Sequence, residues 1–108
     1  KLLGRLSQED TTMKPSVDYH DDLLRRLKNP RYAVGYLNAC LQDDDDGVFL
    51  LALRDVAQVH GGLRSLAGKT HLNREHLFRM LSKKGNPRLH SLRQLIGTFG
   101  FRITLQAA

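Results

Sequence analysis

Three charged side chains, Arg74, Glu75 and Arg79, have types and a spacing that suit one kind of chemistry. A helix over residues 74–84 would place them on one outer face, because positions one turn apart lie side by side. An arginine can present two parallel N–H donors to a guanine edge, and a carboxylate can accept from a cytosine amine. The pattern therefore predicts side chains that read the edges of bases in duplex DNA.

The residues around this trio predict two short helices, at 63–70 and 74–84, that share one core across a tight turn. Asn73 occupies the position of an N-cap residue, whose side chain accepts from the first free N–H groups of a helix. The apolar residues at matching spacing are Leu66, Ala67, Leu72, Leu77, Met80 and Leu81. This spacing is typical of a helix-turn-helix, in which the second helix presents its outer side to the major groove.

The charge distribution also favours a nucleic acid as partner. Residues 62–108 carry nine Lys or Arg residues and one acid, whereas residues 1–61 carry eight bases and ten acids. Cations that replace the counterions of phosphates supply most of the sequence-independent affinity for DNA. We expect Lys69, Lys83, Lys84 and Arg88 to contact the DNA backbone, together with the cap residue Asn73.

The rest of the chain predicts an all-α fold of five to six short helices. Apolar residues at three- and four-residue spacing predict further helices at 21–28, 31–42, 46–60 and 89–99, of which 46–60 should be the buried one. The predicted apolar stripes are Ala33, Tyr36, Leu37, Cys40 and Leu41 for 31–42, and Leu89, Leu92, Leu95, Ile96 and Phe99 for 89–99. The acidic run at 43–46 is expected to cap that helix rather than to bind a metal ion. The alternation of Phe101, Ile103 and Leu105 predicts a C-terminal strand, which needs a partner such as the same strand of a second subunit.

We divide the chain into a flexible leader, residues 1–17, and a single domain, residues 18–108. The leader shows no sustained period, and Met13 within it is a candidate start. A single cysteine, Cys40, excludes an intramolecular disulfide, fits a reducing cytoplasm and is expected to be a small buried core residue. We expect no metal ion, cofactor or membrane span, because the histidines show no ligand spacing and apolar runs are short.

The segment 63–81 resembles the phage-repressor/Cro-type helix-turn-helix family, with a lambda-repressor-like arrangement of helices. With its flanks, FLLALRDVAQVHGG (49–62), LSKKGNP (81–87) and FGFRITL (99–105), it looks like the HigA-like addiction-module antidote proteins. The resemblance covers about residues 19–106. It implies a homodimeric antitoxin that binds a cognate RelE/HigB-like toxin and represses its own operon at the operator DNA.

Two positions depart from the pattern of that family. The tight turn usually holds glycine where this chain has His71, although histidine tolerates a left-handed backbone better than most residues do. The polar residue that often opens the first helix and touches phosphate is Leu63 here. The resemblance nevertheless places the base-contacting positions on Arg74, Glu75 and Arg79 and the helix cap on Asn73.

Other interpretations of the same residues remain. Arg74, Glu75 and Arg79 could form a solvated face with an ion pair between Glu75 and Arg79. Phe78, an apolar residue on the outward side, could meet a thymine methyl, pack on a loop or complete the core. The chain could also be a prophage-type regulator without a toxin, or an interaction module that does not bind DNA. Binding of RNA is less favoured because aromatic residues do not alternate with the bases, and no residues suggest catalysis.

Overall fold

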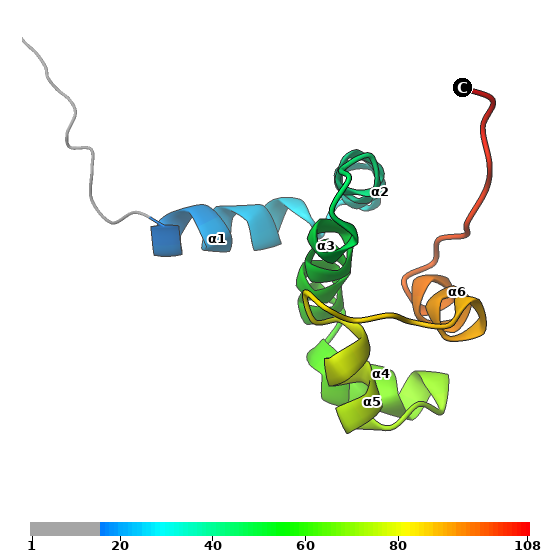
Figure 1. Cartoon of the computed structure of the whole chain (residues 1–108). Helices are drawn as coiled ribbons and strands as arrows, with labels where there is room; N and C mark the ends of the chain where they lie inside the picture. Colours follow the sequence, from blue (N-terminus) through cyan, green and yellow to red (C-terminus); the bar gives the residue numbers. More distant parts are fainter. Residues whose placement is uncertain (1–15) are drawn as a thin grey trace, which may run out of the picture.

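Six helices make up the part of the chain that the computed structural model describes, which is residues 16–108 (Figure 1). They are α1 (Ser16–Arg26), α2 (Pro30–Leu41), α3 (Asp46–Val59), α4 (Gly62–Thr70), α5 (Arg74–Met80) and α6 (Leu89–Thr98). Helix α3 packs against α1, α2 and α4, and α4 in turn packs against α5 and α6. The all-α prediction is therefore confirmed for the described residues, with α3 at the centre.

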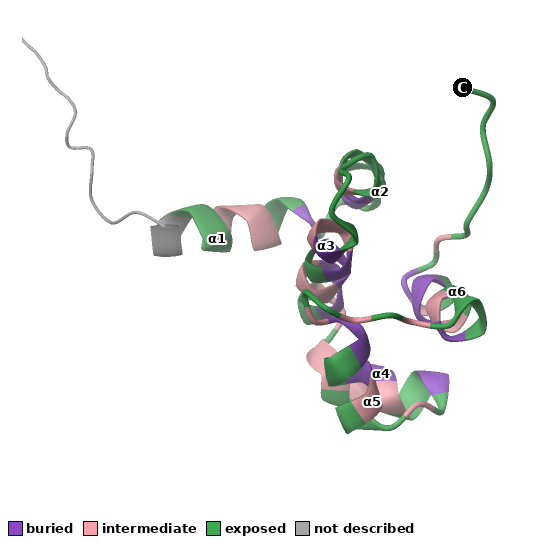
Figure 2. Cartoon of the chain, in the orientation of Figure 1, coloured by how far each residue is buried: buried purple, intermediate pink, exposed green. Residues whose placement is uncertain are grey.

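The core follows the apolar positions of α3 and the faces turned toward it (Figure 2). Leu53 and Val56 are fully buried, and Leu50, Ala52 and Ala57 are nearly so. At the end of α3, the His60 ring lies 4.9 Å from the ring of Phe99, which follows α6. Burial lowers the pKa of His60. The central helix thus links the N-terminal helices to α4–α6, as its pattern predicted.

Helix α1 begins at Ser16, five residues before the predicted start, and ends at Arg26. The prediction placed residues 16 and 17 in the leader, but they form the first turn of this helix. Two ion pairs stabilise the helix, because the Asp22 carboxylate accepts from Arg25 and from Arg26 at 2.8 Å each. Residues 1–15, which hold Met13 and most of the predicted leader, lie outside the described residues.

Helix α5 is shorter than predicted, since it ends at Met80 and not at Lys84. The Ser82 hydroxyl donates to the Arg79 carbonyl at 2.8 Å and satisfies one of the free groups at the helix end. The Gly85 N–H then donates to the Ser82 carbonyl at 2.9 Å. A Cβ at Gly85 would collide with the Met80 carbonyl, so glycine lets the chain fold back over the end of α5.

Three apolar predictions were wrong. Leu41, on the predicted stripe of α2, and Leu89, on that of α6, are each 58% exposed. Cys40 was expected to be buried, yet it is only half-buried, at the edge of the core beside Tyr36. In each case the residue has the right period but lies at or near the end of its helix.

Residues 101–108 form no strand among the described residues, so the predicted C-terminal strand is not found in the single chain. The Phe101 N–H donates to the Ile96 carbonyl at 3.2 Å, and beyond it the segment leaves α6 (Figure 1). A lone segment has no ladder to join, which explains the missing strand. Within residues 16–108, no helix combines the length and the apolar character needed to cross a membrane.

Candidate nucleic-acid interface

Helices α4 and α5 are held together by a small apolar core. Leu66 of α4 and Leu77 of α5 are fully buried, as is Leu81 directly after α5, while Met80 is 3% exposed. Leu72 in the turn is half-buried against them. These are the inward residues that the spacing predicted, so the packing fixes which side of α5 faces outward.

The turn between the two helices uses a residue that the family pattern does not favour. His71 has φ 62° and ψ 15°, a left-handed conformation that costs a non-glycine residue some energy. The predicted tolerance of histidine at this position is confirmed. Thr70, 2% exposed, supports the turn, because its hydroxyl donates to the Leu66 carbonyl at 2.7 Å and accepts from the Leu72 N–H at 3.3 Å.

The role of Thr70 was not predicted from the sequence. A threonine in the last turn of a helix can return a hydrogen bond to the carbonyl four residues earlier, and this signal was available. Its buried hydroxyl serves two backbone groups at once. Thr70 therefore links the last turn of α4 to the turn that precedes α5.

Asn73 is the N-cap of α5, as predicted. Its backbone is extended, with φ −75° and ψ 158°, and its side-chain oxygen accepts from the His76 N–H at 2.6 Å. A cap of this kind satisfies one of the free N–H groups at the start of a helix. It therefore fixes the first turn of α5, which carries Arg74 and Glu75.

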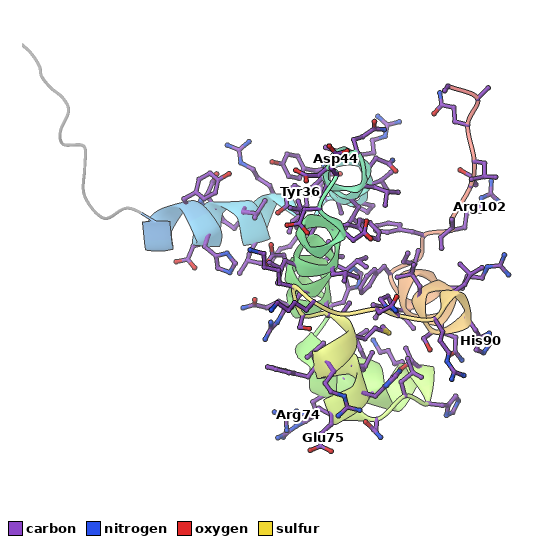
Figure 3. All side chains as sticks on the ribbon, viewed as in Figure 1. Tyr36, Asp44, Arg74, Glu75, His90 and Arg102 are labelled. Carbon is purple, nitrogen blue, oxygen red and sulfur yellow. The ribbon has the colours of Figure 1, made fainter. Side chains whose placement is uncertain are left out.

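The predicted base-reading residues all lie on the outer side of α5. Arg74, Glu75 and Arg79 are exposed, and Arg74 and Glu75 point away from the body of the molecule (Figure 3). Among the described residues, ion pairs join only Asp22 to its two arginines, so Glu75 and Arg79 do not pair. The three side chains are free to meet a ligand along one face.

The predicted backbone contacts come from segments before and after α5. Lys69 is in the last turn of α4, Lys83 and Lys84 follow α5, and Arg88 is the N-cap of α6; all four are exposed. They come from three parts of the chain, so the basic surface is wider than α5 itself. Their role as phosphate contacts stays a prediction.

The position of Lys83 depends on a close contact with the start of α3. A Cβ added to Gly47 would collide with the Lys83 carbonyl and lie 2.8 Å from Lys83 Cγ. Gly47 is buried, and its N–H donates to the Asp45 carboxylate at 2.9 Å. The beginning of α3 therefore supports the loop that follows α5.

The acidic run lies at the start of α3, where Asp43 and Asp46 line a surface hollow together with Gly85 and Asn86 of the loop after α5. Asp44 is beside α2, at the end opposite Arg74 and Glu75 (Figure 3). Asp45 caps α3, and its own N–H donates to the Asp43 carboxylate at 2.8 Å. The capping interpretation of the run is confirmed. The acidic run thus adjoins the loop that carries Lys83, whereas Asp44 lies far from Arg74 and Glu75.

A half-buried polar pair joins α2 to α3. The Tyr36 hydroxyl donates to the Asp55 carboxylate at 3.4 Å. Burial raises the pKa of Asp55, while His20, Tyr36 and Arg54 act in the opposite direction. Burial, followed by the nearby Asp55, raises the pKa of Tyr36 well above its usual value. The pair positions α2 on α3 and lies away from the outward residues of α5.

The predicted dimerisation residues differ in exposure. Phe101 is half-buried, with its ring 6.2 Å from that of Phe99, whereas Ile103 is 44% and Leu105 is 99% exposed. Phe101 and Ile103 line a surface hollow of about 170 Å³ together with Val34, Leu37 and Phe49. The segment therefore leaves two large apolar side chains uncovered.

Phe78 is 52% exposed on the outer side of α5, and its ring is covered by a residue that was not predicted to lie there. The guanidinium carbon of Arg54, in α3, lies 4.5 Å from the centroid of the Phe78 ring. An arginine at that distance forms a cation–π contact. This contact with a helix was not among the predicted roles of Phe78, and its exposure shows that the residue does not complete the core.

One comparison with known proteins gives a match. The model of a family described as "Probable addiction module antidote protein" matches residues 19–107. None of the curated proteins and none of the solved structures matches the chain significantly. The family match includes α2–α6 completely and most of α1. The chain therefore belongs to the probable addiction module antidote family, whose members are antitoxins.

Proposed function

We propose that this antitoxin is a sequence-specific, double-stranded DNA-binding transcriptional repressor. In this proposal it neutralises a RelE/HigB-like toxin of a type II module and represses its own operon. The observation that carries the DNA-binding part is the α4–α5 unit. There, the Asn73 cap and the buried leucines orient Arg74, Glu75 and Arg79 outward among exposed cations. We expect it to act in the cytoplasm at the nucleoid, without catalysis or a cofactor.

Each residue has a separate role in this proposal. Arg74 and Arg79 donate to base edges in the major groove, and Glu75 accepts from a base amine. A carboxylate that faces a polyanion lowers affinity, so Glu75 contributes chiefly to the choice of sequence. Lys69, Lys83, Lys84 and Arg88 contact phosphates, and the Asn73 cap holds the first turn of α5 in place.

The same proposal includes a homodimer. An inverted-repeat operator would take two copies of α5 in successive major grooves, about 34 Å apart. The uncovered Ile103 and Leu105 side chains, with Phe101 at the base of the segment, favour residues 101–105 as the dimer contact. Pairing of this segment with its copy would give its backbone the ladder that one chain lacks.

Two variants test the division between base and backbone contacts. Arg79→Ala should cost about 1–3 kcal/mol on the operator and relax the preference at one base pair per half-site. Lys84→Ala should weaken every sequence alike and reduce the salt slope by about 1 for each phosphate that is no longer bound. Titration of both variants on the promoter of the gene and on mixed-sequence DNA, at several salt concentrations, measures these effects.

Arg31→Ala is the control, because Arg31 is an exposed arginine on α2, away from α4 and α5. Equal decreases in affinity for all sequences with Arg79→Ala and Lys84→Ala would contradict base reading by Arg79.

The antitoxin role has its own measurement, since a toxin should co-purify with the tagged chain when the two neighbouring genes are expressed together. The growth inhibition that the toxin causes in cells should end when this chain is expressed with it.

A further inference from the structure

The contact between Arg54 and Phe78 joins the central helix to the outward side of α5. Phe78 lies one helical turn after Arg74, so both side chains are on the same flank of α5. Arg54 is half-buried, and its guanidinium covers the face of the Phe78 ring at 4.5 Å. An arginine of α3 is therefore held beside the surface that carries Arg74.

A stacked guanidinium keeps its hydrogen-bonding edge available. Its five N–H donors lie in its own plane, so a ring against one face does not occupy them. Within residues 16–108, no carboxylate lies within ion-pair distance of Arg54. The adjacent Asp55 uses its carboxylate to accept from Tyr36. Arg54 thus acts on the adjacent Asp55 at a distance but forms no ion pair among the described residues, and Phe78 orients its guanidinium.

We propose that Arg54 is a phosphate contact of this protein and that Phe78 positions it. The inference rests on the proposed DNA binding and extends that surface from α5 onto α3. The planar guanidinium of Arg54 can bind phosphate oxygens in a bidentate manner, as it can bind a guanine edge, so its position decides between the two ligands. Arg54 lies beside α5 and not on its outermost residues, as a contact to the backbone that borders the groove requires.

The test uses the salt dependence of binding. Each phosphate contact contributes about 0.9 to the slope of log affinity against log salt, so a dimer without both Arg54 contacts should have a slope smaller by about 1.8. From 50 to 200 mM salt the affinity of both dimers for DNA should fall. The factor by which it falls should be about twelve times smaller for Arg54→Met than for the wild type. Fluorescence anisotropy with the promoter duplex and a mixed-sequence duplex of equal length measures both slopes.

The variants separate the charge of Arg54 from its packing. Arg54→Met keeps the apolar stem over Phe78 and removes the charge, and Arg54→Gln is a second uncharged variant. Phe78→Leu keeps the charge but removes the aromatic face, so it should weaken both duplexes equally without altering base preference. Arg31→Met is the matched control, since it removes an exposed arginine from α2, and its slope should equal that of the wild type.

The outcomes are distinguishable from a failure of the proposed function. A wild-type chain that binds neither duplex would overturn DNA binding itself. A wild type that binds, with Arg54→Met and Arg54→Gln folded and showing the wild-type slope, would overturn the role of Arg54 alone. A lower melting temperature with an unchanged slope would assign the contact between Arg54 and Phe78 to stability only.

Discussion

Because Gly47 lies against Lys83, replacing glycine by alanine should destabilise the fold at Gly47 but stabilise it at Gly35. A Cβ at Gly47 would collide with the Lys83 backbone carbonyl and would also lie 3.1 Å from the Asp45 carboxylate oxygen. A backbone carbonyl cannot move aside as the end of a flexible side chain can. At Gly35, inside α2, an added Cβ meets nothing within 4 Å. Gly47→Ala and Gly35→Ala therefore form a matched pair.

The magnitudes follow from packing and helix propensity. Alanine is more favourable than glycine in a helix interior by about 0.8–1.0 kcal/mol, so Gly35→Ala should stabilise the fold by that amount. At Gly47, overpacking should cost about 1–3 kcal/mol and outweigh a smaller gain in the first turn of α3. The two variants should therefore differ by about 2–3 kcal/mol. For a domain of this size, that difference corresponds to roughly 10–20 °C in melting temperature.

Thermal unfolding followed by circular dichroism at 222 nm measures both variants. All samples need the same protein concentration, because the melting temperature of the proposed dimer would depend on it. The wild type should melt below Gly35→Ala and above Gly47→Ala. If Gly47→Ala were as stable as Gly35→Ala, the start of α3 and the loop after α5 would not approach as described, and the support of Lys83 by α3 would be refuted.

Two further predictions concern the cap of α5 and the C-terminal segment. Asn73→Ala should cost about 1 kcal/mol, because the His76 N–H loses its acceptor, whereas Asn73→Asp should retain the stability; an alanine variant with the wild-type denaturant midpoint would contradict the capping role. Ile103→Pro should leave the helix content intact but abolish dimers in light scattering, since proline cannot donate to a ladder. Dimers that persist in this variant would place the association on another surface.

The helices could be predicted from local pattern, but several of their ends could not. All six helices have the predicted apolar period, and the caps at Asn73 and Asp45 follow from residue type. The end of α5 depends on the Ser82 hydroxyl and on the close approach at Gly85, which are relations between neighbouring turns. Leu89 has the right period and is exposed, because a period cannot tell where the partner surface stops.

The residues of the candidate site within one helix could be predicted from the sequence, but the contacts between different helices could not. The outward position of Arg74, Glu75 and Arg79 follows from the stripe of buried residues on the same helix. The contact between Arg54 and Phe78 joins residues of two different helices, and neither helix carries a local signal for it. The contact between Gly47 and Lys83 is of the same kind. Such pairs are set by the packing of α3 against its neighbours, which the sequence pattern does not determine.

Through the contacts of Gly47 with Lys83 and of Arg54 with Phe78, α3 helps to position α5. The burial of α3 alone would not indicate this role. Gly47, near the start of α3, supports the loop after α5, and Arg54, in the middle of α3, covers a ring on the flank of α5. Between them, Leu50 and Leu53 belong to the same core as Leu77 of α5. A small shift of α3 would therefore move both flanks of α5 together.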